Sequence, residues 1–161
     1  MKKSGFTLVE ILIVVIILGI LAAIVIPQFT SASESAKESN LKSDLLTLRN
    51  QLELYRVQHG DRYPWEVVAS ATSADIVEQL TSKTDESGSV LATGKFGPYL
   101  DKMPTNLFVK DRGGATPDEF DVSAAAVTVA STSGDGWIID TVNNKVYANS
   151  DPTAYPDHFN F

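Results

Sequence analysis

Hydrophobic and polar positions divide the chain into an apolar start, a polar link and a patterned body. Residues 6–26 are almost wholly apolar, and only Thr7, Glu10 and Gly19 interrupt them. A helix of these 21 residues measures roughly 31 Å, which is long enough to span a bilayer. Residues 28–40 are polar and small without an apolar stripe, and they predict either a solvated helix or a frayed one.

Helical periodicity returns in the body. Five apolar residues recur at spacings of four, three, four and three, and therefore share one helix face: Leu41, Leu45, Leu48, Leu52 and Tyr55. This stripe predicts a face that packs on the domain's own sheet. A coiled-coil seam is the alternative, but the stripe covers barely two heptads, and such a seam needs three or four.

The sequence also predicts ion pairs on this helix and the residue at which the helix ends. Glu38 with Lys42, and Arg49 with Glu53, are pairs four residues apart and are expected on the exposed side. The helix is expected to stop at residues 59–60, with Gly60 as its C-terminal cap, and a turn follows over residues 61–64.

The remaining segments predict a short helix and a small sheet. Thr72 and Asp75 have the spacing of a capping box, so a helix is expected over about 73–82, followed by a loop over 84–97. Strands are expected in the run 120–130 and in a hairpin of residues 137–142 and 145–148. Asn143 and Asn144 tolerate the positive φ that its turn needs. Three antiparallel strands over the apolar stripe give an α+β fold, and the aromatic tail 150–161 is expected to fold back onto the surface.

Composition narrows the function. The chain has 161 residues, which allows one main domain, and it carries 20 acidic against 13 basic residues. Lys2 and Lys3 stand apart at the N-terminus, so the body is more acidic than the net charge of −7 indicates. Binding to nucleic acid is not expected, because no basic surface is available for phosphates. Cysteine is absent, which excludes a disulfide framework and a thiolate metal site.

The apolar segment predicts a membrane anchor with a defined orientation. Lys2 and Lys3 precede it, and no basic cluster follows, so the N-terminus is expected in the cytoplasm and the body outside. A cleaved secretory signal is the alternative, since small residues follow near Ala22 and Ser31. The apolar run is longer than the usual ~7–15 residues, however, and it contains Glu10. A carboxylate inside a bilayer costs up to ~3.5 kcal/mol at the helix centre and therefore usually has a partner.

The segment KKSGFTLVE with its apolar helix resembles the class III leader of type IV pilins and type II secretion pseudopilins. The resemblance implies cleavage between Gly5 and Phe6 by a prepilin peptidase, and methylation of the new Phe6 amine. Glu10 would then pair with that amine on a neighbouring subunit during assembly. The alternatives for Glu10 are snorkelling to the headgroups or pairing with Lys2 or Lys3 of its own precursor. Pro27 matches the family pattern, and it is expected to kink the helix, with Gly19 as a second soft point.

Two further segments carry the resemblance into the body. Residues 60–64 (GDRYP) are pseudopilin-like, and residues 97–104 (GPYLDKMP) resemble a segment of major secretion pseudopilins, although Leu107 replaces an expected second proline. The implied fold is pilin-like, with a leader at 1–5, a transmembrane and filament-core helix at 6–27, and a periplasmic body at 28–161. The implied function is a structural subunit of a type II secretion pseudopilus. A type IV pilin for adhesion, motility or DNA uptake is the alternative, and a membrane-anchored binding domain or enzyme is more remote.

The resemblance also implies partners and a location. The partners would be further copies of the chain, minor pseudopilins, the prepilin peptidase, the inner-membrane platform with its assembly ATPase, and membrane lipid. The protein would be held in the inner membrane by a single span and then extracted into a filament.

No enzymatic site emerges from the motifs. Residues 89–96 approach a phosphate loop, but Ser89 replaces its first glycine and Phe96 its hydroxyl residue. Only two histidines are present, so neither a histidine-rich metal centre nor a histidine-based triad is expected. Major pseudopilins hold a calcium ion in an acidic loop, and this sequence departs from that pattern. Asp135, Asp140 and Asp151 are weak calcium candidates, and solvated turn aspartates are the simpler interpretation. No other cofactor is expected.

Overall fold

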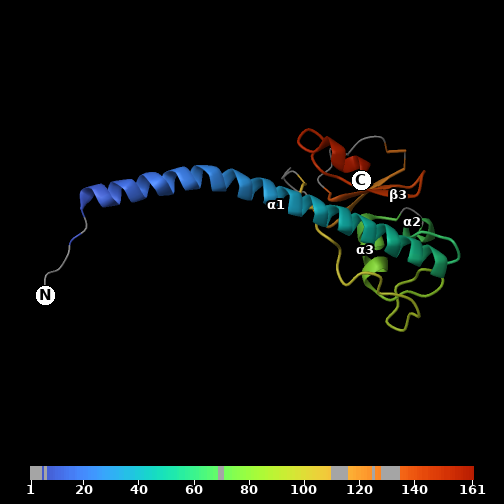
Figure 1. The fold of residues 1–161 in the computed structure, drawn as a ribbon. Helices are drawn as coiled ribbons and strands as arrows, with labels where there is room; N and C mark the ends of the chain where they lie inside the picture. The colour runs from blue at the N-terminus through green and yellow to red at the C-terminus, as the bar shows by residue number, and fades with distance from the viewer. Residues whose placement is uncertain (1–4, 6, 69–70, 110–115, 125, 128–134) are drawn as a thin grey trace. The chain divides into compact units, whose positions relative to one another are not determined.

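The computed structural model describes residues 5, 7–68, 71–109, 116–124, 126–127 and 135–161 (Figure 1). Contacts divide the chain into two compact units, Met1–Ser39 and Asn40–Phe161, and each is described by itself. The elements, in order, are the helices α1 (Leu8–Gln58), α2 (Pro64–Val67) and α3 (Ser73–Thr81), the strands β1 (Phe120–Ser123), β2 (Trp137–Asp140) and β3 (Lys145–Ala148), and the 3-10 helix η1 (Pro156–Asn160).

The first unit consists of the N-terminal part of α1. The polar residues 28–40 are helical throughout, so of the two expected forms the solvated helix is confirmed. Pro27 lies inside α1, and the helix continues past it. Thr30 Oγ1 donates to the carbonyl of Ile26, and Ser31 Oγ to that of Pro27, each at 3.2 Å. Such bonds to a carbonyl four residues back often bend a helix, which supports the expected kink at Pro27. That kink and the soft point at Gly19 stay predictions.

The second unit contains the core. All five residues of the predicted stripe are buried, none more than 3% exposed, and they belong to one cluster with Trp137, Ile139 and Val146 of the sheet. The stripe therefore packs within its own domain, as the first of the two interpretations predicted.

Helix ends follow the sequence closely. α1 ends at Gln58, Gly60 has φ +67°, and Asp61 N donates to Arg56 O at 2.9 Å, which closes the helix as predicted. The expected turn at residues 61–64 leads directly into α2, which sequence analysis missed. α3 begins with the predicted box, because Thr72 Oγ1 donates to Asp75 Oδ2 at 2.6 Å.

The sheet has the order β1-β2-β3. β2 and β3 are antiparallel, with Asp140 opposite Lys145, while β1 and β2 run parallel, with Phe120 opposite Trp137. The α+β, pilin-like fold is confirmed, but the expectation of three antiparallel strands is wrong. A long connection joins β1 to β2, and only strands joined by a tight turn must be antiparallel.

The strands are also shorter than expected. β1 ends at Ser123, and residues 125 and 128–130 of the expected strand 120–130 lie outside the described residues. β2 ends at Asp140, so the turn to β3 has four residues instead of two. Asn144, one of the two asparagines chosen for the turn, has φ +52°.

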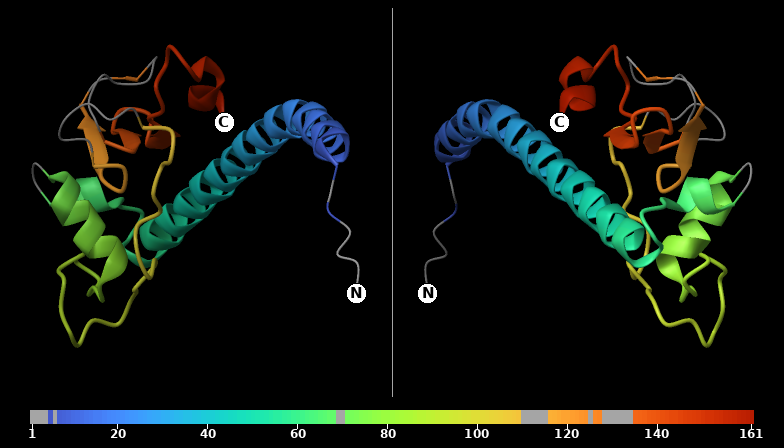
Figure 2. Two further views of the ribbon diagram at one scale, coloured as in Figure 1. Left: turned by 90° about the vertical axis from the view of Figure 1, so that its left-hand side faces the viewer. Right: turned by 90° about the vertical axis from the view of Figure 1, so that its right-hand side faces the viewer.

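The C-terminal tail folds back, as expected, and reaches the core. Tyr155 and Phe161 pack against the core cluster, and η1 contacts β3. Arg49 of α1 donates to the Val146 carbonyl at 2.8 and 3.1 Å and to a terminal main-chain oxygen of Phe161 at 2.9 Å. The expected pair of Arg49 with Glu53 is therefore wrong, because main-chain oxygens distant in sequence bind the guanidinium. Figure 2 shows the sheet and tail at one end of this unit and the loop 84–97 at the other.

Candidate functional site

The N-terminal segment is organised by two side chains before and within the first turn of α1. Thr7 N and Thr7 Oγ1 both donate to Glu10 Oε2 at 2.8 Å, and Glu10 N donates to Thr7 Oγ1 at 3.3 Å. This reciprocal arrangement is a capping box, which satisfies backbone donors that a helix start leaves without a partner. The Thr-x-x-Glu spacing is present in the sequence, but the role of Glu10 in starting the helix was not predicted from it.

The expected processing site lies beside this box. Gly5 is exposed, and a Cβ added to it would meet no atom within 4 Å. Phe6 and the leader residues 1–4 lie outside the described residues, so cleavage after Gly5 and methylation of Phe6 stay predictions. Glu10 is exposed as well, and its carboxylate is accessible to a partner from outside the chain.

The part of α1 around and after Glu10 has an apolar surface that no other described residue covers. The large apolar side chains between Leu8 and Phe29 are 42–82% exposed. Among the described residues, α1 is the one helix long and apolar enough to cross a membrane, and none of its apolar window is buried. Soluble monomers rarely expose so large an apolar surface, so lipid or other protein chains must cover this segment.

The carboxylate of Asp140, one of the calcium candidates, accepts hydrogen bonds from groups of the protein itself. Its side chain is fully buried. Oδ1 accepts from Val142 N and Asn143 N at 2.9 Å each, and Oδ2 accepts from Val127 N at 2.9 Å and Asn143 Nδ2 at 2.8 Å. Burial by itself raises the pKa of this carboxyl, but the four hydrogen bonds outweigh it and lower the pKa below its ordinary value. Asp140 therefore organises the turn between β2 and β3.

The other two candidates are not brought into a common site. Asp135 Oδ1 accepts from Thr116 Oγ1 at 2.7 Å, and Asp151 Oδ1 accepts from Thr153 N at 3.0 Å. The described part of the chain holds no group of three or more His, Asp or Glu side chains suited to a metal ion. Calcium prefers six to eight oxygen ligands, and binding of calcium by Asp135, Asp140 or Asp151 stays a prediction.

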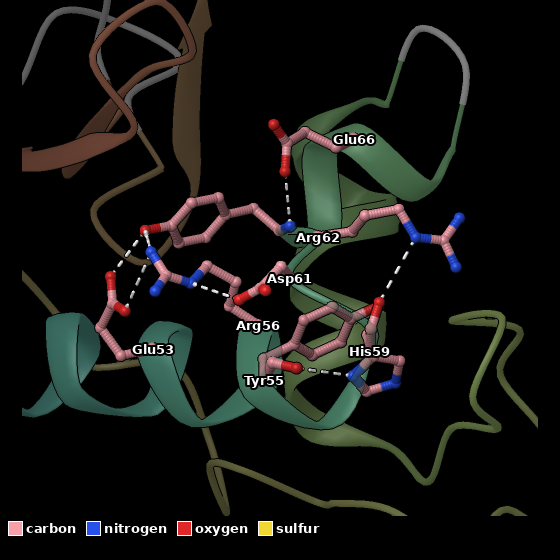
Figure 3. A network of polar contacts seen from close by, with 8 residues as sticks. Glu53, Tyr55, Arg56, His59, Asp61, Arg62 and Glu66 are labelled. Carbon is pink, nitrogen blue, oxygen red and sulfur yellow. Dashed lines mark hydrogen bonds and ion pairs between the residues drawn. The ribbon is translucent and has the colours of Figure 1, made fainter.

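Both histidines serve the core. Just after the C-terminal end of α1, His59 Nδ1 lies 2.8 Å from the Tyr55 carbonyl (Figure 3). His59 Nε2 lies 3.0 Å from Thr84 Oγ1. The ring stacks on Tyr55 at 3.7 Å, and Tyr55 donates its hydroxyl to Gln79. Burial raises the pKa of Tyr55 above its ordinary value. Both ring nitrogens of His59 are thus engaged in hydrogen bonds inside a closed core.

His158 is likewise buried, in the tail. Its Nδ1 lies 2.9 Å from Ser150 Oγ, and the rings of Phe108 and Tyr155 contact it at 4.5 and 4.8 Å. Its position holds η1 against the loop that contains Phe108.

The comparisons with known proteins agree with this picture. Residues 1–26 match the prokaryotic N-terminal methylation motif. The chain is 45% identical to type II secretion system core protein G of Pseudomonas aeruginosa over 105 residues, which are 65% of this chain and 68% of that protein. It is 41% identical to the Aeromonas hydrophila protein of the same description over 63 residues, 39% of this chain and 43% of that protein. The Escherichia coli relative is 28% identical over 120 residues, 73% of this chain and 75% of that protein. No solved structure matches the chain.

These matches leave part of each relative outside the alignment. The aligned segments span less than half of the Aeromonas hydrophila relative and about two thirds of the Pseudomonas aeruginosa one.

A methylation motif that includes the capped start of an apolar helix, which continues into an α+β body, defines a protein of the pilin-like class. The length and sequence identity of the Pseudomonas aeruginosa match narrow this class to one family. The chain belongs to the type II secretion system core protein G family, the major pseudopilins. This membership confirms the expectation of a structural protein without enzymatic activity.

Proposed function

We propose that the chain is the major structural subunit of a type II secretion pseudopilus, which a prepilin peptidase processes and which assembles into a helical filament. The observation that carries this proposal is the start of α1, where the Thr7–Glu10 box places a carboxylate at the head of an exposed apolar helix. The methylation motif over residues 1–26 and the named relatives support the same function.

Processing would create a cationic partner for Glu10 on a neighbouring subunit. Cleavage between Gly5 and Phe6 leaves a cationic amine at Phe6, one residue before the capping box. A carboxylate and an amine in a low-dielectric filament core attract each other strongly, whereas each alone is costly to bury. Glu10 would accept from the amine of a neighbouring subunit while Thr7 keeps the carboxylate oriented.

The proposed organisation follows from this function. Residues 1–5 form the leader, 6–27 the transmembrane and later filament-core helix, and 28–161 the amphipathic continuation and periplasmic body. The subunit waits in the inner membrane with its N-terminus in the cytoplasm. Pro27 would bend the helix near the end of the span, with Gly19 as a second flexible point.

The proposed partners are other copies of the chain, minor pseudopilins, the prepilin peptidase, an inner-membrane platform with its assembly ATPase, and lipid. Energy for extraction must come from that ATPase, because no phosphate loop is present in this sequence.

Mass spectrometry of the mature protein from cells with a type II secretion system tests the processing step. The expected N-terminus is a methylated Phe6, and a variant with Gly5→Leu should retain Met1. A mature N-terminus at Met1 in the unchanged chain, or well beyond Phe6, overturns the proposal.

Filament assembly tests the role of Glu10. Glu10→Gln keeps the size of the side chain but removes its charge, and it is expected to abolish filaments while cleavage continues. Glu10→Asp is the control that keeps the charge and should retain partial assembly. Normal filaments from Glu10→Gln would show that the amine pairing is wrong.

A further inference from the structure

In the second unit, α1 has an exposed apolar face besides its buried stripe. Leu46, Leu54 and Val57 are 59%, 45% and 70% exposed. With Asn50 they follow one another at spacings of four, four and three residues, so all four share one side of the helix. We call these four residues the outer face. The buried stripe lies on the opposite side of α1.

The outer face groups apolar side chains that the rest of the second unit exposes singly. Among the described residues of this unit, six large apolar side chains are exposed, and half of them belong to the outer face. The other three are Leu91, Leu107 and Val142, each in a different segment of the chain. Single exposed apolar residues are normal on a protein surface, whereas a group of them favours contact with a partner.

The outer face is uncharged, and the charged residues beside it on α1 are engaged elsewhere. Lys42 Nζ lies 4.1 Å from the centre of the Phe161 ring, and Arg49 binds main-chain oxygens of the sheet and the tail. Glu53 pairs with Arg56 at 3.4 Å (Figure 3). The face is therefore suited to an apolar, uncharged partner, because a charged partner would lose its hydration without gaining an opposite charge.

The apolar segment 8–29 of another copy has the matching chemistry. Its large apolar side chains are 42–82% exposed, and residues 11–26 carry no charge. In the proposed function, lipid covers this segment while the subunit is held in the membrane, and extraction into a filament removes the lipid. Exposing so many apolar side chains to water is costly, so protein surfaces must then cover the segment.

We propose that the outer face of one copy covers part of the apolar segment 8–29 of another copy in the filament. Leu46, Leu54 and Val57 then pack along the neighbouring helix. The two contact surfaces are different parts of the chain, so the contact is heterologous and can continue from copy to copy instead of closing a dimer. This inference rests on the proposed function, because extraction is the step that deprives the segment of lipid.

Photo-cross-linking in assembled filaments tests which surface the outer face meets. Leu54→p-benzoylphenylalanine places a reactive side chain on the face, and Leu107→p-benzoylphenylalanine is the control, at a site that is 61% exposed and outside it. Irradiation of filaments from cells with a type II secretion system should join Leu54 to a second copy. Mass spectrometry of the digested dimer should then find the bond within residues 8–29, with at least about fivefold less of this product from the control.

Polar substitution tests whether the contact supports assembly. Leu46→Gln combined with Leu54→Gln removes apolar surface that the subunit itself leaves exposed. The melting temperature in detergent should therefore stay within about 2 °C of the unchanged chain. The yield of filaments should fall roughly tenfold, because the contact loses apolar burial. Leu107→Gln combined with Val142→Gln is the matched control and should change the yield less than about twofold.

Several results overturn the inference. A cross-link from Leu54 to another part of a second copy, to lipid or to a different protein would show another occupant, and absence of any cross-link would show that nothing covers the face. Unchanged filaments from the double variant, or an equal loss in its control, would also overturn it. These failures are separable from the proposed function, because N-terminal processing and the effect of Glu10→Gln on filaments are measured independently.

Discussion

Replacing Asp140 with alanine removes the acceptor of four hydrogen bonds at the turn between β2 and β3. Bonds to a charged acceptor contribute about 1.5–3 kcal/mol each when the donors stay buried, but the turn donors at Val142 and Asn143 can be hydrated again. We therefore expect Asp140→Ala to lower the free energy of unfolding by about 4 kcal/mol. The free energy of unfolding of a whole domain is roughly 5–15 kcal/mol, so this loss would be a large share of it.

Asp140→Asn separates charge from shape. The amide keeps one oxygen for two of the donors but turns an N–H₂ group toward the other two. We expect a loss of about 2 kcal/mol, between the unchanged chain and alanine. Asp101→Asn, on an exposed carboxylate, is the control and should change stability by less than about 0.5 kcal/mol.

Urea unfolding of the full chain in detergent, followed by tryptophan fluorescence, measures these values. Trp137 is fully buried on the same strand as Asp140 and reports loss of the core. The melting temperature should fall by roughly 15 °C for Asp140→Ala. A loss below about 1 kcal/mol in that variant would refute the reasoning. If Asp140 instead held calcium, EGTA would destabilise the unchanged chain and spare Asp140→Asn.

The pH dependence of the same variants gives a second check. The pKa of Asp140 is lower in the folded chain than its ordinary value of about 4. The stabilisation is therefore complete above that ordinary value and disappears as the pH falls through the lower folded pKa. The difference in unfolding free energy between the unchanged chain and Asp140→Asn should be constant near neutral pH and shrink below about pH 4.

Three substitutions test other parts of the body by thermal unfolding. Tyr55→Phe leaves Gln79 without its phenolic donor in a closed core and is expected to cost about 1–3 kcal/mol, and no loss would mean that the bond contributes nothing. Gly136→Ala places a Cβ 1.9 Å from the Pro117 carbonyl and should cost at least about 3 kcal/mol or prevent folding. Gly60→Ala meets open space, so only its φ of +67° matters and the cost should be about 1 kcal/mol. Equal stability of the two glycine variants would contradict the close approach at Pro117.

The elements that sequence predicted are those fixed by local chemistry. The stripe from Leu41 to Tyr55 needs only helical spacing, and the box at Thr72 and the cap at Gly60 need only adjacent residues. The direction of β1 could not be predicted in this way. It depends on a pairing across a long connection, which leaves no periodic signal in either strand.

The candidate site shows the same division. Glu10 stands out in the sequence because a carboxylate is costly in an apolar helix. Its bonds to Thr7 were established only by the structure, where α1 begins directly after Thr7. Arg49 shows the opposite case. The spacing rule assigned it to Glu53, but main-chain oxygens 97 and 112 residues away bind it instead. The groove between α1, α2, β3 and the tail could not be predicted from sequence, because its walls come from four separate segments.

The bond between Arg49 and the terminal main-chain oxygen of Phe161 also has a practical consequence for experiments. Phe161 lines a groove between α1, α2, β3 and the tail, so any polypeptide fused after it begins inside that groove. An epitope tag or fluorescent protein at this end would disturb the contact of Arg49 with Phe161 and the packing of the tail on the core. Labels placed on exposed side chains of α3, such as Glu78, would leave these contacts intact.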